Sequence, residues 1–200
     1  MGPTIDQNQR DERHASILAA ARKVFAEKGY ERTAVTDIVR EAGVAQGTFY
    51  LYFPSKQDAF FALADAFFSE MAGHVGAALE AEPDPGERVR AITHSCFVAA
   101  SENADLVRLV FFGSDSASAA AQERFSEANP VVDAIRGMIE AGVEGGDLEL
   151  DDPEVTARLL VGLVRTAVLE AYVLGDGSGA DRLERATAQM FARTLGMVEG

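Results

Sequence analysis

Apolar side chains recur along most of this chain at intervals of three or four residues. The first such stripe lies between residues 11 and 28 and contains Ile17, Leu18, Ala21, Val24 and Phe25. This spacing places the apolar side chains on one face of an α-helix. The strict alternation that is typical of half-buried strands is nearly absent. The pattern therefore predicts an all-α fold of about nine helices.

Glycine, proline and capping residues divide this pattern into separate elements. Gly29 ends the first helix, Thr33 is expected to cap the second, and Gly43 ends it. Pro54 stops a short third helix of residues 46–53, and Ser55 is expected to cap a long fourth helix that reaches about residue 79. Later helices are predicted at about 87–100 and about 104–112, where residues 113–116 break the pattern. Another helix then runs to about residue 143, with a kink or division at Asn129-Pro130, and the last two are predicted at 154–174 and 181–195.

Residues 33–56 carry the clearest functional pattern, two short helices joined by a tight turn. Gly43 permits a positive φ, so the two helices can cross steeply. Small and hydrogen-bonding side chains then crowd the outer face of the second helix: Gln46, Gly47, Thr48, Tyr50 and Tyr52. Such a helix fits the major groove of DNA, where glutamine can pair with an adenine edge. Tyrosine hydroxyls and the Lys56 ammonium suit phosphate oxygens.

The charge distribution supports a DNA-binding N-terminal part. The whole chain has a formal net charge of −14, which by itself argues against a nucleic-acid partner. Residues 1–56, however, hold eight Lys and Arg against seven Asp and Glu, whereas residues 57–200 hold ten Arg against 25 Asp and Glu. The acidic part would repel phosphate, so DNA is expected to meet only the N-terminal part. Acidic surfaces also keep proteins dissolved, and that is the simpler interpretation of the body.

The segment TAVTDIVREAGVAQGTFYLYFPSK and the helix before it resemble the DNA-binding region of the TetR family of bacterial repressors. The likeness rests on the spacing of Thr33, Ile38, Ala42, Gly43, Val44, Gly47, Phe49, Tyr50, Tyr52, Phe53, Ser55 and Lys56. Three positions depart from what the family leads us to expect: Val39 replaces an alanine, Ala45 replaces the usual capping serine, and Leu51 offers only van der Waals contact to DNA. The resemblance is specific over about residues 12–63, and beyond them only helix layout agrees.

The resemblance implies a three-helix, helix-turn-helix DNA-binding domain over residues 1–54 and an effector-binding and dimerisation domain over residues 55–200. By position it implies DNA contacts from Thr36, Gln46, Gly47, Thr48, Tyr50, Leu51, Tyr52 and Lys56. It also implies a homodimer that joins helices 154–174 and 181–195 of two chains. The sequence supports this because the first of these helices is apolar on nearly all sides and the second is amphipathic. Burial of both helices within one chain is the alternative.

Phenylalanines mark a candidate effector pocket. Seven of the twelve lie between residues 60 and 112. An apolar cavity with few polar groups would suit a hydrophobic or aromatic effector. Arg165 and Glu170 interrupt the apolar helix and could line that pocket, pair with each other or face solvent. Ordinary core packing remains the alternative for each member of the predicted pocket: Phe67, Met71, His74, His94, Phe97, Phe111, Arg165 and Tyr172.

The sequence carries no Gly-rich phosphate loop, no nucleophile elbow and no metal-ligand spacing, so we expect no enzyme activity, cofactor or metal. The single cysteine, a polar N-terminus and the lack of a long uncharged apolar run predict a cytoplasmic protein that does not span a membrane. The expected function is a repressor that binds a palindromic operator and is released by a small hydrophobic effector. The alternatives are a helical interaction module without DNA binding, an activator and a corepressor-dependent regulator.

Overall fold

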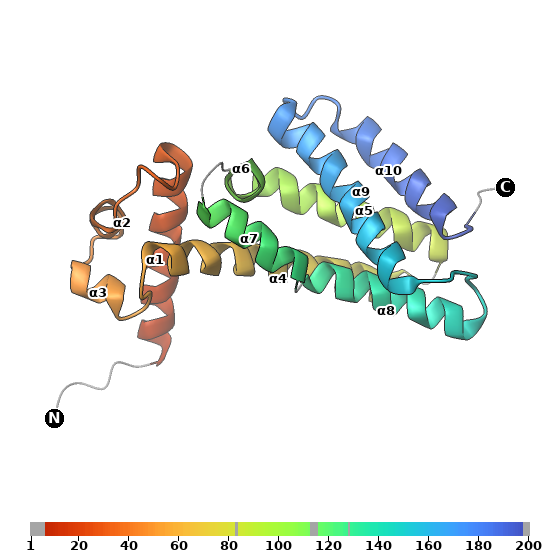
Figure 1. The fold of residues 1–200 in the computed structure, drawn as a ribbon, viewed down its shortest axis with the longest axis horizontal. Coiled ribbons are helices and arrows are strands. Elements are labelled where there is room, and N and C mark those ends of the chain that lie inside the picture. The colour runs from red at the N-terminus through yellow and green to blue at the C-terminus, as the bar shows by residue number, and fades with distance from the viewer. Residues whose placement is uncertain (1–6, 83, 113–115, 128, 198–200) are drawn as a thin grey trace. The chain divides into compact units, whose positions relative to one another are not determined.

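A computed structural model describes residues 7–82, 84–112, 116–127 and 129–197 (Figure 1). Within these residues the chain forms α-helices, one π-helical segment and no strands, which confirms the predicted all-α class. The elements are α1 (Gln7–Lys28), α2 (Val35–Ala42), α3 (Gln46–Tyr50), α4 (Lys56–Ala81), α5 (Pro85–Glu102), α6 (Ala104–Phe112), α7 (Ser116–Glu127), α8 (Pro130–Gly145), α9 (Pro153–Leu169), η1 (Glu170–Leu174) and α10 (Ala180–Thr194).

The chain divides into two compact units. The first comprises residues 1–66 and 108–124, and the second comprises residues 67–107 and 125–200. In the first unit the side chains of Ile17, Phe25, Ile38, Phe49 and Phe60 are at most 1% exposed. In the second unit the same holds for Val75, Ile92, Phe97, Ile135 and Phe191. Each unit therefore has an apolar core of its own.

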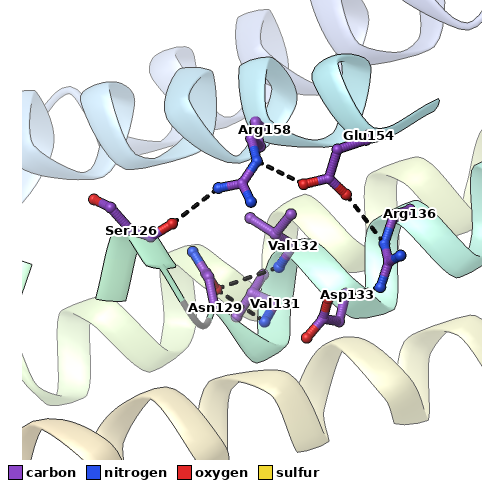
Figure 2. A network of polar contacts seen from close by, with 8 residues as sticks. All are labelled: Ser126, Asn129, Val131, Val132, Asp133, Arg136, Glu154 and Arg158. Carbon is purple, nitrogen blue, oxygen red and sulfur yellow. Dashed lines mark hydrogen bonds and ion pairs between the residues drawn. The ribbon is translucent and has the colours of Figure 1, made fainter. Parts of the chain in front are cut away.

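Asn129 divides the helical segment that follows residue 116, as the Asn-Pro pair predicts. Its side-chain oxygen accepts hydrogen bonds from the backbone N–H groups of Val131 (3.0 Å) and Val132 (3.2 Å), as Figure 2 shows. Pro130 occupies the first helical position, where no N–H is needed. The result is a capped start for α8, separate from α7.

Glu154 and Arg158 link α9 to two other parts of the second unit (Figure 2). Its carboxylate accepts a hydrogen bond from Arg158 Nε at 2.6 Å and forms an ion pair with Arg136 Nε at 3.2 Å. Arg158 also donates through Nη1 to the backbone oxygen of Ser126, 2.9 Å away near the end of α7. These contacts fix the start of α9 against α7 and α8.

The helix predicted at 154–174 is an α-helix only as far as Leu169 and continues as the π-helical η1. Its apolar side chains do not all pack inside the chain. Ala157, Leu160, Val164, Ala167 and Val168 are buried, whereas Val155 is 49% and Leu159 is 69% exposed. The helix therefore keeps an apolar outer stripe.

Among the residues that the structure describes, no helix combines the length and the apolar character needed to cross a membrane.

Candidate nucleic-acid interface

The turn between α2 and α3 depends on Gly43. This residue has a φ of +65° and follows the last residue of α2. The N–H of Gly43 donates to Arg40 O at 3.4 Å, and the N–H of Val44 donates to Val39 O at 3.0 Å. A side chain with a Cβ rarely adopts this backbone conformation, so glycine is required here. The predicted tight turn is present, and α2 and α3 form a helix-turn-helix.

Thr33 does not cap α2, so that expectation is wrong. Ala34 is the capping residue, and its N–H donates to the Asp37 carboxylate at 3.1 Å. The Thr33 hydroxyl is buried and donates instead to Gly29 O, 2.8 Å away at the end of α1. The chain therefore enters α2 one residue later than predicted, with Asp37 reaching back to the helix start.

Ion pairs join α1 to α2. Lys28 Nζ lies 2.8 Å from Asp37 Oδ1, and Lys23 Nζ lies 2.6 Å from Glu41 Oε1. The hydrogen bond from Lys28 holds the pKa of Asp37 below its usual value, with the Ala34 N–H as the next cause. Exposed pairs of this kind stabilise a fold little, but their geometry orients α2 on α1.

Helix α3 is short, and it buries one side while exposing the other. Phe49 is fully buried and anchors the helix, whereas Gln46 and Gly47 are exposed. Tyr50 is 49% exposed and Leu51, just beyond the helix, is 77% exposed. A single exposed apolar side chain is common on protein surfaces, so Leu51 marks this surface only together with its exposed neighbours.

The other predicted DNA contacts lie around this helix. Thr36 is exposed on α2, Thr48 is half-buried on α3, and Tyr52 is half-buried in the turn after α3. The predicted third helix ends at Tyr50 rather than Phe53, so Leu51 and Tyr52 belong to that turn. Ala45 caps α3 without a side-chain hydrogen bond, as its departure from the family pattern predicts.

Lys56 makes contacts that the sequence did not suggest. Its Nζ donates to the backbone oxygens of Tyr30 at 2.7 Å and Thr33 at 2.9 Å. The same atom lies 4.0 Å from the centre of the Tyr30 ring. These partners precede Lys56 by 26 and 23 residues, so no local pattern reveals them.

His14 is a second residue that sequence reasoning missed. Its ring lies on α1, and its centre is 4.8 Å from that of Phe53 and 6.2 Å from that of Tyr52. The ring thus packs against the turn that follows α3. Tyr52 and Phe53 lie 38 and 39 residues after His14 in the chain, so no local pattern reveals these contacts.

The predicted effector-pocket residues have mixed surroundings. In the second unit Phe67 and Phe97 are buried, Met71 is half-buried, and Phe97 lies 6.2 Å ring to ring from Tyr172. Burial, then Glu184, raises the pKa of Tyr172. His74, His94 and Arg165 are exposed, and His94 Nδ1 lies 3.0 Å from Glu184 Oε1. Phe111 belongs to the first unit and is half-buried.

One aromatic pair in the second unit was missed. Phe68 and Phe125 stack with their ring centres 3.6 Å apart, and both are buried. Phe125 lies outside the phenylalanine-rich stretch of residues 60–112, so its contact with Phe68 depends on the fold.

Two family models match the chain. "Bacterial regulatory proteins, tetR family" matches residues 17–63, and "AefR-like transcriptional repressor, C-terminal domain" matches residues 90–194, more than half of the chain. The chain belongs to the tetR family of bacterial regulatory proteins. The family confirms the resemblance seen in the sequence, and the matched relatives are described as transcriptional regulators.

Individual proteins agree with this assignment. The uncharacterized HTH-type transcriptional regulator YvdT of Bacillus subtilis is 31% identical over 105 residues, which are 52% of this chain and 54% of YvdT. The chain spans about half the length, or less, of the first curated relatives that it matches.

Solved structures share the fold over nearly the whole chain. A TetR-family regulator from Syntrophomonas wolfei has a TM-score of 0.82 at 21% identity and covers 95% of this chain and 98% of its own. The regulator FadR from Bacillus subtilis, solved in complex with stearoyl-CoA, has a TM-score of 0.76 at 19% identity and covers 93% of this chain and 100% of its own.

Proposed function

We propose that this protein is a cytoplasmic, dimeric repressor that binds a palindromic operator and leaves it when a small hydrophobic effector binds. The observation that carries the proposal is the exposed side of α3 and the turn after it, where Gln46, Gly47, Tyr50 and Leu51 face solvent around a fully buried Phe49. A short helix anchored on one side and open on the other can enter a major groove.

The contacts divide by chemistry. Gln46 can bond an adenine edge, Thr48 and Leu51 can touch thymine methyl groups, and Gly47 lets the backbone approach the bases closely. Thr36 and the hydroxyls of Tyr50 and Tyr52 suit phosphate oxygens. Lys56 retains one N–H beyond the two that bond backbone oxygens, and that N–H is available to a phosphate.

A second copy of the chain would cover the outer stripe of α9. Val155 and Leu159 lie four residues apart on that stripe, and on the neighbouring α10 Met190 is 53% exposed. Burial of these side chains would favour association of 153–169 and 180–194 with the same helices of a partner. A dimer would then present two copies of α3 to successive major grooves, about 34–36 Å apart.

An acyl chain or another apolar molecule is the proposed effector. The second unit holds many of the chain's buried aromatic side chains, among them Phe67, Phe68, Phe97 and Phe125. The similarly folded FadR was solved with stearoyl-CoA, which makes long-chain acyl-CoA a rational first ligand to test. The effector would shift DNA affinity only by its preference for one dimer conformation over the other.

Selection of duplexes from a random pool tests the proposal. The full chain is incubated at moderate salt with and without acyl-CoA, after circular dichroism and sedimentation have established that it is folded and dimeric. We expect enrichment of a palindrome with half-sites about one helical turn apart, and release on addition of the effector. Absence of enrichment under both conditions would contradict DNA binding. Enrichment that requires acyl-CoA would replace simple release by corepression.

A further inference from the structure

The Lys56 ammonium occupies a site made by the turn between α1 and α2. Lys56 is the first residue of α4, and its side chain is half-buried. Its Nζ lies 2.7 Å from Tyr30 O, 2.9 Å from Thr33 O and 4.0 Å from the centre of the Tyr30 ring. Two charge-assisted hydrogen bonds and a ring face therefore converge on one compact cation.

The location of this cation is unfavourable for α4 itself. The N-terminal end of a helix carries partial positive charge, so a lysine in the first turn is repelled by the helix dipole. The two carbonyl oxygens offset that repulsion. Because they use two of the three N–H groups, a phosphate can bond only the third unless it replaces a carbonyl oxygen.

The carbonyl oxygens belong to the part of the chain that leads into the helix-turn-helix. The N–H of Thr33 donates to Tyr30 O at 3.2 Å, so that oxygen serves both Thr33 and Lys56. Ala34, which follows directly, caps α2. The Lys56 side chain thus joins the start of α4 to the residues that fix the start of α2.

Aromatic packing reinforces the same junction. The Tyr30 ring lies 5.5 Å from that of Phe25 on α1 and 5.2 Å from that of Phe60 on α4. Phe60 is one helical turn after Lys56, so α4 holds Tyr30 through an ammonium and through a ring. A movement of the first turn of α4 would have to carry the turn between α1 and α2 with it or break these contacts.

We propose that Lys56 is a positioning residue, which clamps the start of α4 to the turn between α1 and α2 and so sets the orientation of α2 and α3 for DNA. Phosphate contact is the secondary role of its ammonium. The inference rests on the proposed DNA-binding function. It adds that movement of α4 reaches the recognition helix through this clamp.

Two substitutions separate a clamp from a phosphate contact. Lys56→Met keeps a long apolar stem but removes all donors, and Lys56→Arg keeps the charge but replaces the compact ammonium by a planar fork that suits phosphate better. We expect both variants to bind the selected duplex on the order of tenfold more weakly, the equivalent of a lost hydrogen bond to a charged group. The slope of log affinity against log salt is expected to stay that of the wild type in Lys56→Arg and to fall by at most about 0.9 in Lys56→Met, which loses the secondary phosphate contact.

Amide hydrogen exchange on the free protein provides a readout that needs no DNA. The Thr33 amide, which bonds to Tyr30 O, is expected to exchange faster in both variants. Arg10→Met is the matched control, because it removes one charge from an exposed position on α1, away from the contacts that join α1 to α2. It is expected to leave Thr33 exchange unchanged and DNA affinity close to that of the wild type.

Three outcomes would overturn the clamp. One is wild-type affinity in Lys56→Arg together with a salt slope reduced by about 0.9 in Lys56→Met, as expected for one lost phosphate contact. Another is unchanged Thr33 exchange in both variants. The third is wild-type DNA affinity in both. If Lys56→Met does not fold, Lys56→Arg still carries the exchange test. If the wild type binds no duplex, the proposed function fails while the exchange result still decides whether the clamp exists.

Discussion

Cys96 is the single thiol of the chain, and it lies 4% exposed on α5. Burial raises the pKa of this thiol from 9.0 to about 12, because the thiolate would lose its hydration. The unfolded chain would therefore release the proton at lower pH than the folded chain. The stability that this group contributes is complete below about pH 9 and is lost as the pH rises toward 12.

We expect Cys96 to react with a thiol reagent only when the second unit opens. At neutral pH the native protein should be labelled at the rate of its opening, whereas protein in denaturant should be labelled at once. An aromatic disulfide reagent releases a coloured thiolate when it labels Cys96, and the absorbance of that thiolate measures both labelling rates. Immediate labelling under native conditions would contradict the burial of Cys96, and Cys96→Ala supplies the unlabelled baseline.

The lowered pKa of Asp37 leads to a prediction about the stability of the protein in acid. Its pKa lies below 3.8, first because of the hydrogen bond from Lys28 and then because of the Ala34 N–H. A lowered pKa stabilises the fold above the unfolded value and ceases to do so as the pH falls through the folded value. Asp37→Asn is therefore expected to lower the denaturant midpoint of unfolding at pH 7. The difference in midpoint between variant and wild type should become smaller below pH 4. An equal difference in midpoint at pH 7 and below pH 4 would show that the charge of Asp37 does not contribute to stability.

At the scale of elements, the wide turn of η1 depends on Gly175. A Cβ at this position would lie 2.8 Å from Glu170 O and 3.0 Å from Ala171 O, both backbone atoms that cannot turn away. We expect Gly175→Ala to lower the free energy of unfolding by about 1–3 kcal/mol, the usual cost of forced overpacking. Gly73→Ala on α4 is the matched control.

The control makes the same chemical change in open space, because a Cβ at Gly73 meets nothing within 4 Å. In a helix interior alanine is favoured over glycine, so Gly73→Ala should raise stability by about 0.5–1 kcal/mol. Urea unfolding at fixed pH measures both variants. If the two substitutions have the same sign, the contact with the η1 carbonyl oxygens is not what constrains Gly175.

Local sequence signals predicted most elements, and long-range contacts account for what they missed. The bounds of α6, the division at Asn129 and the cap at Ser55, whose hydroxyl accepts from the Asp58 N–H at 3.2 Å, follow from neighbouring residues. The π-helical end of α9 has no periodicity of its own. The partners of Thr33, His14 and Lys56 are supplied by tertiary packing, so capping rules and motif spacing could not assign them.

At the scale of the whole molecule, ion pairs hold the start of α9, where its exposed apolar stripe begins. Glu154 is held by Arg136 and Arg158 at the start of the helix, next to Val155. The stripe continues through Leu159 to Gly162 and Thr166, at helical spacing. Small residues beyond Leu159 would let a partner helix approach closely. This outer face of a firmly held helix is better suited to contact with a partner chain in the proposed dimer than to exposure to solvent.

Leu159→Glu tests that dimer and its link to DNA. The side chain is 69% exposed in the single chain, so the substitution should leave the protomer folded but place a charge in the proposed interface. We expect sedimentation equilibrium to give a monomer. Affinity for a palindrome should fall at least on the order of 100-fold, because a monomer binds one half-site without the avidity of the second.

Ala77→Glu is the matched control, because it adds the same charge at an exposed position of α4 and should remain dimeric. If Leu159→Glu remains dimeric with full affinity, the dimer uses another surface. If it is monomeric yet binds the palindrome as tightly as the wild type, dimerisation through α9 is not what brings two recognition helices to the operator.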